Sequence, residues 1–256
     1  MPTSSELSLE ELIDRAGYAA SRAAYMKLVV QCAIETLQHA EAQLNKDWFA
    51  FCAKKGATRR PRKGAKNKTV RPDENAITYE LGDYVNGFLR NLPVEHPFRQ
   101  VRFDFECPTK SKRLAGSRRK RLDLRFEAFH PGGPEFVIEA KRLLALADVT
   151  NRYLGDEGLG RFVREEEPLT RDQLGALLGY VPQSSASTWR KAIRDATVAV
   201  DGCDLMVNVT LGSWDKTYSS RHGRPASLSP LWILHLFVKY PELPQVETAV
   251  SPKGEY

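Results

Sequence analysis

Two short stretches, RLDLRFEAF at residues 121–129 and EFVIEAK at residues 135–141, decide the fold of this chain. Each alternates charged and apolar residues with a period of two, which is typical of a β-strand buried on one face. Between them lies HPGGP, residues 130–134, a run of turn-forming residues. The pattern predicts a β-hairpin.

The pairing of the hairpin places its charged residues. If Phe129 lies opposite Glu135, Asp123 faces Lys141, and Glu139 becomes a diagonal neighbour of Asp123 at roughly 7–8 Å between backbones. Two carboxylates and one ammonium group then share a face, an arrangement that can hold a divalent metal ion and position a water molecule. The apolar residues expected on the opposite, core-facing side are Leu122, Leu124, Phe126, Phe136, Ile138 and Ala140.

Asp123, Glu139 and Lys141 together resemble the signature of the PD-(D/E)xK nuclease superfamily, which has a restriction-endonuclease-like fold. The resemblance implies that Asp123 and Glu139 are carboxylate ligands of Mg²⁺, for which Mn²⁺ can substitute. It also implies that Lys141 orients the attacking water and offsets charge on the scissile phosphate. Leu122 stands where the family pattern has proline.

The spacing D-x15-E-x-K alone has low specificity, because many basic proteins contain it by chance. The alternative interpretation is that Glu139 and Lys141 form the solvated face of an edge strand. The order of the other expected elements favours the family, whose core is an α/β unit of helix, three-stranded antiparallel hairpin sheet, helix and strand. The expected elements are a helix at 73–90 capped by Asp73, a strand at 99–107, the hairpin, a helix at 187–200, and strands at 204–211 and 231–238.

Members of the superfamily often add a glutamate from the first helix to the metal site, and two residues compete for that role here. At 100° per residue, Glu74 falls on the inward apolar stripe of the expected helix and Glu80 falls at its edge. Glu74 is therefore the preferred third ligand. The competing interpretation is that Glu74 only favours the positive N-terminus of the helix.

Several later segments are less specific. The glycine-containing stretch 153–163 could cradle phosphate or serve as a flexible connection, and residues 172–181 are expected to form a helix packed behind the site. Ser220, His222 and Arg224, spaced by two, could present polar groups to phosphate or lie on an exposed strand edge.

Basic residues are concentrated in two segments. The chain has 38 Lys and Arg against 32 Asp and Glu. Residues 54–71 contain nine basic residues and residues 110–121 contain seven, and neither segment contains an acid. Such runs suit salt-dependent, sequence-independent binding to a phosphate backbone. The predicted nucleic-acid-binding residues are Lys112, Arg113, Arg118, Arg119, Lys120 and Arg121. A solvated linker is the alternative, above all for the first segment.

These features divide the chain into a helical region at 1–53, a basic flexible linker at 54–72 and a nuclease domain at 73–256. In the first region Ser8 and Glu11 form a capping box, and Gly17 is the weak point of one long helix or a helical pair. Its apolar stripe needs a partner, either the protein's own core or a second copy in a homodimer.

Composition favours a cytoplasmic protein without membrane association. No apolar run approaches the length of a membrane span, and the first residues do not form a signal peptide. The four cysteines lack CxxC spacing, which argues against zinc and for a reducing compartment.

The leading hypothesis is a Mg²⁺-dependent endonuclease that hydrolyses DNA phosphodiester bonds. Its resemblance to nucleases of bacterial defence systems implies a role as an anti-phage effector, with a regulatory partner protein as a safeguard. An RNA or repair nuclease of the same fold is one alternative. The other is a non-catalytic nucleic-acid-binding or assembly protein in which the carboxylates are structural.

Overall fold

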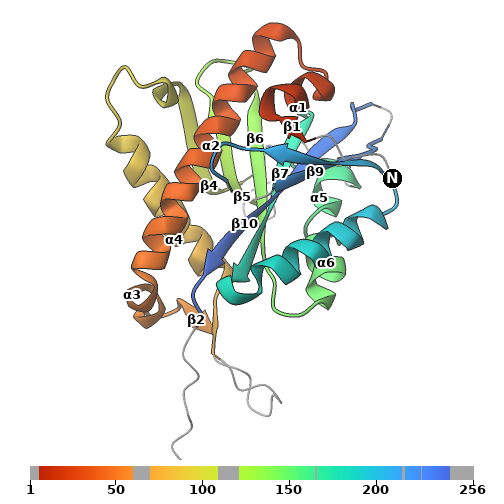
Figure 1. Ribbon diagram of the computed structural model, residues 1–256. Helices are drawn as coiled ribbons and strands as arrows, with labels where there is room; N and C mark the ends of the chain where they lie inside the picture. Colours follow the sequence, from red (N-terminus) through yellow and green to blue (C-terminus); the bar gives the residue numbers. More distant parts are fainter. Residues whose placement is uncertain are drawn as a thin grey trace, which may run out of the picture.

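The computed structural model describes residues 6–59, 70–108, 121–164, 166–214, 217–225 and 227–242. Within these residues eight strands form one mixed sheet in the order β1-β8-β9-β10-β7-β6-β5-β4 (Figure 1). The strands are β1 (Leu7–Ser8), β4 (Val101–Pro108), β5 (Arg121–Ala128), β6 (Glu135–Arg142), β7 (Leu174–Pro182), β8 (Cys203–Thr210), β9 (Thr217–His222) and β10 (Leu231–Tyr240). The chain is therefore a mixed α/β protein.

The sheet combines antiparallel and parallel pairs. β4, β5 and β6 are antiparallel neighbours, β7 pairs parallel with both β6 and β10, and β9 pairs antiparallel with both β10 and β8. The connection between the parallel strands β6 and β7 contains a π-helical turn, η3 (Val149–Tyr153), and the short helix α5 (Gly160–Val163). Helix α4 (Glu74–Arg90) precedes β4, with the 3-10 turn η1 (Pro97–Gln100) between them.

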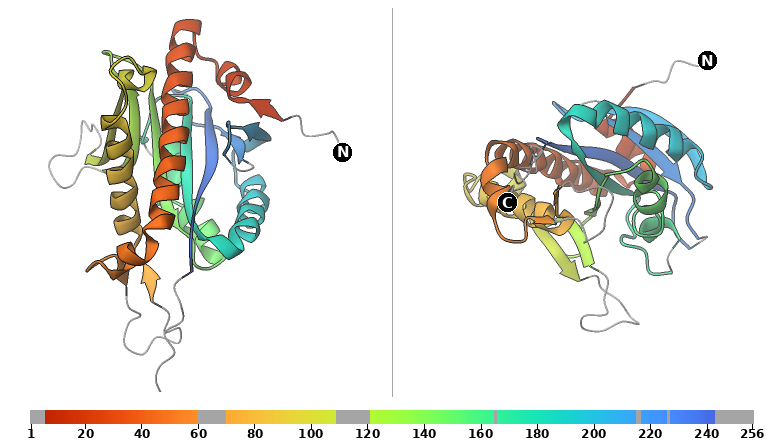
Figure 2. Two further views of the ribbon diagram at one scale, coloured as in Figure 1. Left: turned by 60° about the vertical axis from the view of Figure 1, so that its left-hand side comes forward. Right: turned by 90° about the horizontal axis from the view of Figure 1, so that it is seen from below.

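Helices cover both faces of the sheet. The long helix α2 (Ala20–Lys46) and α4 run side by side along one face, while α5 and α6 (Ala186–Val198) lie on the other (Figure 2). Each face has its own buried apolar cluster: one includes Leu37, Leu81 and Phe126, and the other includes Phe162 and Ile193. The central strands are consequently buried on both sides.

The N-terminal helices share the first of these clusters. Helix α1 (Leu9–Ala16) has the predicted capping box of Ser8 and Glu11 and ends at Gly17, whose φ of 84° is favoured by glycine. The predicted helical pair is thus present as α1 and α2, followed by α3 (Trp48–Ala53). The apolar stripe of α2 packs within the chain's own core.

Residues 60–69 of the predicted linker lie outside the described residues. The two ends of that segment pair with each other, since β2 (Thr58–Arg59) and β3 (Arg71–Pro72) form a small antiparallel ladder. The described residues on either side of 60–69 therefore lie side by side, and β3 is followed by α4.

The hairpin forms as predicted, but its register differs from the expected one. Phe126 pairs with Phe136, so Asp123 lies level with Glu139 rather than with Lys141. The hairpin is closed in this register by the N–H of Ala128, which donates to the carbonyl oxygen of Pro134. Because the shift is two residues, the charged side chains keep the predicted face. Leu122 is an exception on the core side, since it packs in the cluster on the α5 and α6 face.

Residues 172–181 are not a helix as predicted: Leu174–Pro182 is the central strand β7. A buried apolar run without polar positions carries no periodicity that separates helix from strand. Its glycines serve close packing, since a Cβ on Gly175 would lie 3.0 Å from the ring of Phe162.

Neither expectation for Ser220 and His222 is correct. Both side chains are buried in β9, inside the sheet. The hydroxyl of Ser220 is 2.7 Å from Nε2 of His222 and 2.7 Å from Nε2 of His235, and His235 also contacts the hydroxyl of Tyr153. Arg224 donates to the backbone oxygens of Thr170 and Ser229. Ser220, His222, His235 and Tyr153 form an internal polar network, to which Arg224 does not belong.

Across the described ranges, no helix has the length and apolar character needed to cross a membrane.

Candidate active site

The predicted carboxylates and lysine converge at one end of β6. Nζ of Lys141 lies 2.6 Å from Oε1 of Glu139, 3.9 Å from Oδ2 of Asp123 and 4.0 Å from Oε1 of Glu74. Strands β5 and β6 and the first turn of α4 supply the three acids. One ammonium group therefore lies within 4.0 Å of three carboxylates that are far apart in sequence.

Asp123 occupies the point where β5 separates from β6. The described ladder between these strands ends at Leu124 and Ile138, and Oδ2 of Asp123 then accepts the backbone N–H of Ala140 at 2.7 Å. The side chain replaces the missing strand partner. This anchoring fixes the carboxylate beside Lys141.

Glu74 completes the acidic group from the first turn of α4. Asp73 caps α4 by accepting the N–H groups of Asn75 and Ala76, which sets the start of the helix. Oε2 of Glu74 accepts the backbone N–H of Arg142 at 2.7 Å. Of the two glutamates considered for this position, Glu74 lies in the cluster, whereas Glu80 pairs with Lys54.

Two arginines in the cluster were not singled out from the sequence. Nη1 of Arg161 donates to Oε1 of Glu139 at 2.6 Å, and Nη2 of Arg152 contacts both carboxylate oxygens of Glu74 at 3.1 and 2.9 Å. Arg161 lies in the stretch 153–163 that was expected to cradle phosphate or act as a connection, and Arg152 directly precedes that stretch. No local pattern marks them, since their positions depend on how that stretch folds back.

Glu106 is a further acid that the sequence did not indicate. It lies on β4 next to Asp123, and its φ of 49° makes it the one non-glycine residue with positive φ among those described. Such a conformation is rare for a residue with a Cβ and concentrates at functional sites. In the β4–β5 ladder Phe105 pairs with Leu124 and Cys107 with Leu122, while Glu106 and Asp123 form no ladder pair.

Burial and mutual repulsion raise the pKa values of the acids. Burial first, and then the charge of Asp123, raise the pKa of Glu139 to about 7, although Lys141 and Arg161 oppose the shift. Burial also raises the pKa of Asp123. For Lys141, burial acts to lower the pKa, but Glu139 and Asp123 outweigh it and the net shift is upward. The ammonium therefore stays charged near neutral pH.

The donor set suits a hard divalent cation. Carboxylate oxygens are the ligands that Mg²⁺ prefers, and Oε2 of Glu139 is buried without a hydrogen-bond partner in the described part of the chain. A buried oxygen without a hydrogen-bond donor in the protein fits a position where a metal ion would bind. In the present arrangement the acids turn toward Lys141, Arg152 and Arg161, and the described residues contain no preformed cluster of three metal-ligating side chains.

The two basic segments both end at this cluster. The carbonyl oxygen of Pro72, which follows the first segment, accepts Nη1 of Arg142, and that of Arg121 accepts Nη2 of Arg161 at 2.6 Å. Of the predicted nucleic-acid-binding residues, Arg121 is described and lies beside Glu106. The others, Lys112, Arg113, Arg118, Arg119 and Lys120, lie outside the described residues.

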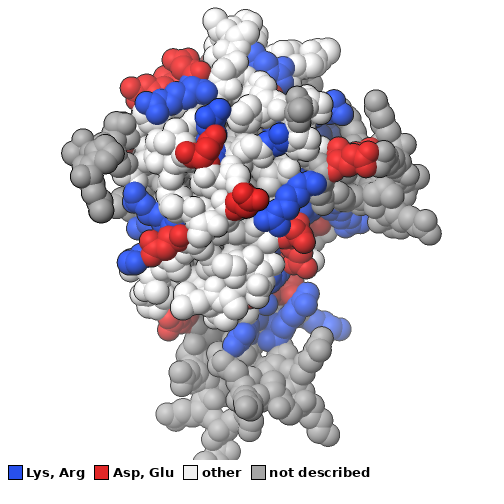
Figure 3. All heavy atoms as spheres, turned by 90° about the vertical axis from the view of Figure 1, so that its right-hand side faces the viewer, with Lys and Arg blue, Asp and Glu red and all other residues white. Residues whose placement is uncertain are grey.

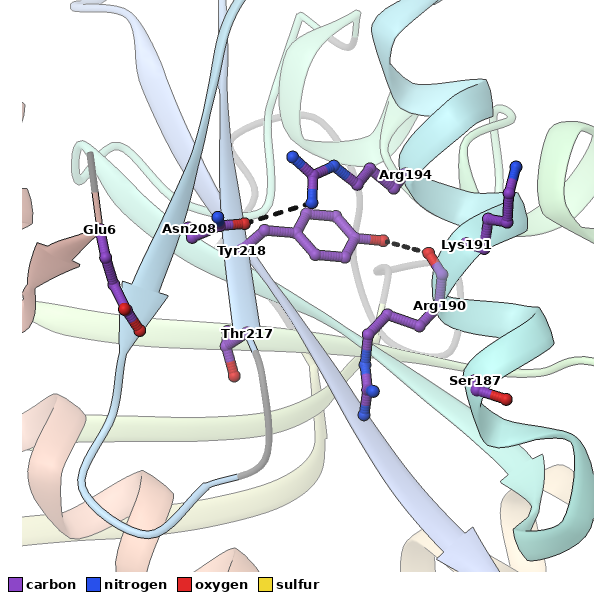
Figure 4. Close-up of a pocket in the computed structure, with 8 residues that line it drawn as sticks. All are labelled: Glu6, Ser187, Arg190, Lys191, Arg194, Asn208, Thr217 and Tyr218. Carbon is purple, nitrogen blue, oxygen red and sulfur yellow. Dashed lines mark hydrogen bonds between the residues drawn. The ribbon is translucent and has the colours of Figure 1, made fainter. Parts of the chain in front are cut away.

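A hollow lies apart from the acidic cluster, between α6 and strands β8 and β9 (Figure 4). Its lining includes three basic side chains of α6: Arg190, Lys191 and Arg194. Arg194 donates to Oδ1 of Asn208 at 3.3 Å. On the face in Figure 3, basic and acidic side chains are intermixed, and basic ones gather near the lower end of the view. Among the described residues that line the hollow, Glu6 is the one acid, in contrast to the group of acids at β6.

Comparisons with protein families, with curated proteins and with solved structures gave no match to this chain.

Proposed function

We propose that the chain is a divalent-metal-dependent endonuclease of the PD-(D/E)xK type that hydrolyses phosphodiester bonds in DNA. The observation that carries the proposal is the convergence of Asp123, Glu139 and Glu74 on the ammonium group of Lys141 within 4.0 Å. Placing three acids around one buried lysine costs free energy, because each charged group loses hydration. Sites of this kind are candidates for chemistry.

The fold supports the same proposal. The elements α4, β4, β5, β6, the helical segment of η3 and α5, and β7 follow one another as helix, three antiparallel strands, helix and a strand parallel to the third. This is the element order of a restriction-endonuclease-like core, with η3, α5 and β7 in the places that the sequence assigned to a helix at 187–200 and a strand at 204–211. The carboxylates lie where the described ladder between β5 and β6 ends.

In this proposal Asp123 and Glu139 hold the metal ion, and Glu74 contributes a third carboxylate. Bound Mg²⁺ or Mn²⁺ would supply Lewis acidity and lower the pKa of a coordinated water. Lys141 holds the attacking water by hydrogen bonding from Nζ and offsets the charge that develops on the phosphate. The water oxygen forms a bond to phosphorus as the bond to the leaving oxygen breaks, so one strand is cut.

Charge distribution supports a nucleic-acid substrate. Both basic segments lead into the site, at Pro72 and at Arg121. Their charges would hold the phosphate backbone without reading its sequence. The described residues of the site offer no base contact that selects DNA over RNA, so RNA is the second substrate to test. The role in anti-phage defence and the regulatory partner rest on the resemblance alone.

A second candidate function is favoured by one observation. Each acid at β6 already contacts a cation of the chain, which is also what a purely structural ion-pair network would look like. In that case the protein binds nucleic acid without cleaving it.

One experiment separates the two. Supercoiled plasmid, single-stranded DNA and RNA are incubated with Mg²⁺ or Mn²⁺ and with wild type, Lys141→Ala or Glu139→Ala. Metal-dependent cleavage that both substitutions abolish supports the nuclease. Salt-sensitive binding of the same nucleic acids without cleavage by the wild type rejects it in favour of the binding protein.

A further inference from the structure

The segment between β6 and β7 brings two arginines to opposite sides of the acidic cluster. Residues 149–163, called the arginine segment below, comprise η3 and α5. Arg152 contacts Glu74, and Arg161 contacts Glu139. The segment rests on the buried side chains of Tyr153, Leu159 and Phe162, which set its position on the sheet.

The backbone of this segment is closely folded on itself. The N–H of Leu159 donates to the carbonyl oxygen of Tyr153, and a Cβ on Gly158 would lie 2.1 Å from that same oxygen. A Cβ on Gly155 would lie 2.2 Å from the carbonyl oxygen of Asn151. Only glycine fits at these two positions, so the two arginines are presented from a fixed backbone.

The three cations of the cluster differ in their access to solvent. Only 7% of the Lys141 side chain is exposed, against 16% for Arg161 and 31% for Arg152. Lys141 is enclosed by the acids, whereas both arginines approach from the rim. Arg152 also has a second acidic neighbour, Glu157, at 3.5 Å, where it can rest when it leaves Glu74.

The charges of the cluster create a competition. Three carboxylates, those of Glu74, Asp123 and Glu139, contact Lys141, Arg152 or Arg161, and Oε1 of Glu139 accepts from both Lys141 and Arg161 at 2.6 Å each. A divalent ion would bind the oxygens that the arginines now hold. A phosphate group entering with that ion would bring the anionic, bidentate partner that a guanidinium group prefers.

We propose that Arg161 and Arg152 are exchangeable counterions: they neutralise Glu139 and Glu74 in the metal-free protein and move to the substrate phosphate when metal and nucleic acid bind. This inference rests on the proposed function, because it assigns these residues to the same site. It makes the arginines competitors of the metal and ligands of the substrate. A purely structural ion pair would do neither.

The test measures metal and substrate binding separately, using Arg161→Gln, Arg152→Gln and the control Arg164→Gln. Arg164 lies at the end of the same helix, is 51% exposed and pairs with Asp156 outside the cluster. Titration calorimetry with Mn²⁺ on chelator-treated protein should give a Kd about tenfold lower for Arg161→Gln than for wild type, since one charge-assisted hydrogen bond no longer competes. Arg161→Gln should bind a short DNA duplex in Ca²⁺ about tenfold more weakly than the wild type. The control Arg164→Gln should change neither the Mn²⁺ affinity nor the duplex affinity.

Arg161→Lys is the second variant, in case the glutamine variant is poorly folded. It keeps the charge but loses the planar fork, so Mn²⁺ affinity should stay near wild type while duplex binding weakens. Equal or weaker Mn²⁺ binding by both glutamine variants, or no Mn²⁺ binding by any form, would overturn the proposal.

Cleavage by the wild type decides the nuclease function independently. If the wild type cleaves and Mn²⁺ affinity does not respond to the arginines, the counterion proposal fails alone. If the wild type does not cleave but Arg161→Gln binds Mn²⁺ more tightly, the nuclease fails and the competition with metal stands.

Discussion

The carboxylate of Asp123 and the backbone of Ala140 are joined by a hydrogen bond of 2.7 Å at the point where the described ladder between β5 and β6 ends. The hydrogen bond to one oxygen of Asp123 thus stabilises the strand end and holds the carboxylate beside Lys141. The same residue is the first proposed metal ligand. Structure and chemistry can therefore be separated by substitution.

Asp123→Asn should preserve the fold and remove metal binding. The amide oxygen of asparagine can still accept the N–H of Ala140, whereas Asp123→Ala leaves that group unpaired at a cost of about 1–3 kcal/mol. Thermal denaturation in chelator should show Asp123→Asn near wild type and Asp123→Ala less stable. Saturating Mn²⁺ should stabilise the wild type by about 2.7 kcal/mol at a concentration of 100 Kd and should stabilise neither variant. An equal Mn²⁺ effect on all three proteins would remove Asp123 from the metal site.

Replacing Lys141 by methionine should destabilise the metal-free protein strongly. The variant leaves Asp123 and Glu139 without their shared ammonium group, and breaking a buried ion pair costs about 3–5 kcal/mol. Urea denaturation in chelator measures the loss, and Mn²⁺ should restore part of it by supplying positive charge.

Lys54→Met is the matched control for that experiment. Lys54 also pairs with a glutamate, Glu80, but its side chain is largely exposed. Its removal should cost less than about 1 kcal/mol, with no dependence on Mn²⁺. If both lysine variants lose the same stability, the acids at β6 are not held together by Lys141.

Gly158→Ala should disrupt the arginine segment without unfolding the sheet. The added Cβ would collide with the carbonyl oxygen of Tyr153, and overpacking of this kind costs about 1–3 kcal/mol. Gly87→Ala in α4 is the control, because a Cβ there meets no atom within 4 Å and should stabilise the helix by roughly 0.5–1 kcal/mol. We expect cleavage to fall in Gly158→Ala and to persist in Gly87→Ala. Full activity of Gly158→Ala would show that the placement of the segment is unimportant.

The contribution of His222 to stability should be lost as the pH drops from 6.5 toward 4. Burial lowers the pKa of His222 to about 4, and its Nδ1 has no hydrogen-bond partner in the described part of the protein. The unfolded chain takes up a proton near pH 6.5 while the folded protein resists it. The stabilisation that neutral His222 contributes is therefore fully present above pH 6.5. It falls by roughly 3 kcal/mol as the pH drops toward 4.

Comparing the wild type with His222→Gln over that pH range tests the assignment. Glutamine does not titrate in this range. As the pH drops, the variant should therefore lose less unfolding free energy than the wild type. Burial also lowers the pKa of His235 well below its usual value, so some dependence should remain in the variant. Parallel pH profiles for the two proteins would show that His222 does not contribute.

Neutralising the second basic segment should weaken nucleic-acid binding and reduce its salt dependence. For double-stranded DNA, removing one cation that binds a phosphate lowers the slope of log K against log salt by about one. Glutamine substitutions at Arg118, Arg119 and Lys120 are compared with substitutions at Lys191 and Arg194 in the hollow beside α6. Fluorescence anisotropy of a labelled duplex at several salt concentrations gives the slopes. A larger change from the α6 variant would place the nucleic acid on that surface instead.

The alternation of residues 121–129 and 135–141 determined the strands of the hairpin, and with them the shared face of Asp123, Glu139 and Lys141. Helix signals were also local: Asp73 caps α4, and Ser8 and Glu11 form the capping box of α1. Glu74 could be chosen over Glu80 because helical periodicity is a property of neighbouring residues. Such features survive because they depend on residues within a few positions of one another.

The tertiary structure decided what no local pattern encodes. A buried run such as Leu174–Pro182 is apolar on all sides, so only its pairing with β6 and β10 makes it a strand. The alternation did not fix the register of the hairpin, because a shift of two residues keeps every side chain on its face. Arg152 and Arg161 reach the acids only because the arginine segment folds back over the sheet, and Glu106 enters the site through a backbone irregularity in β4. These contacts join residues far apart in sequence, and they stabilise the protein only once the sheet has formed.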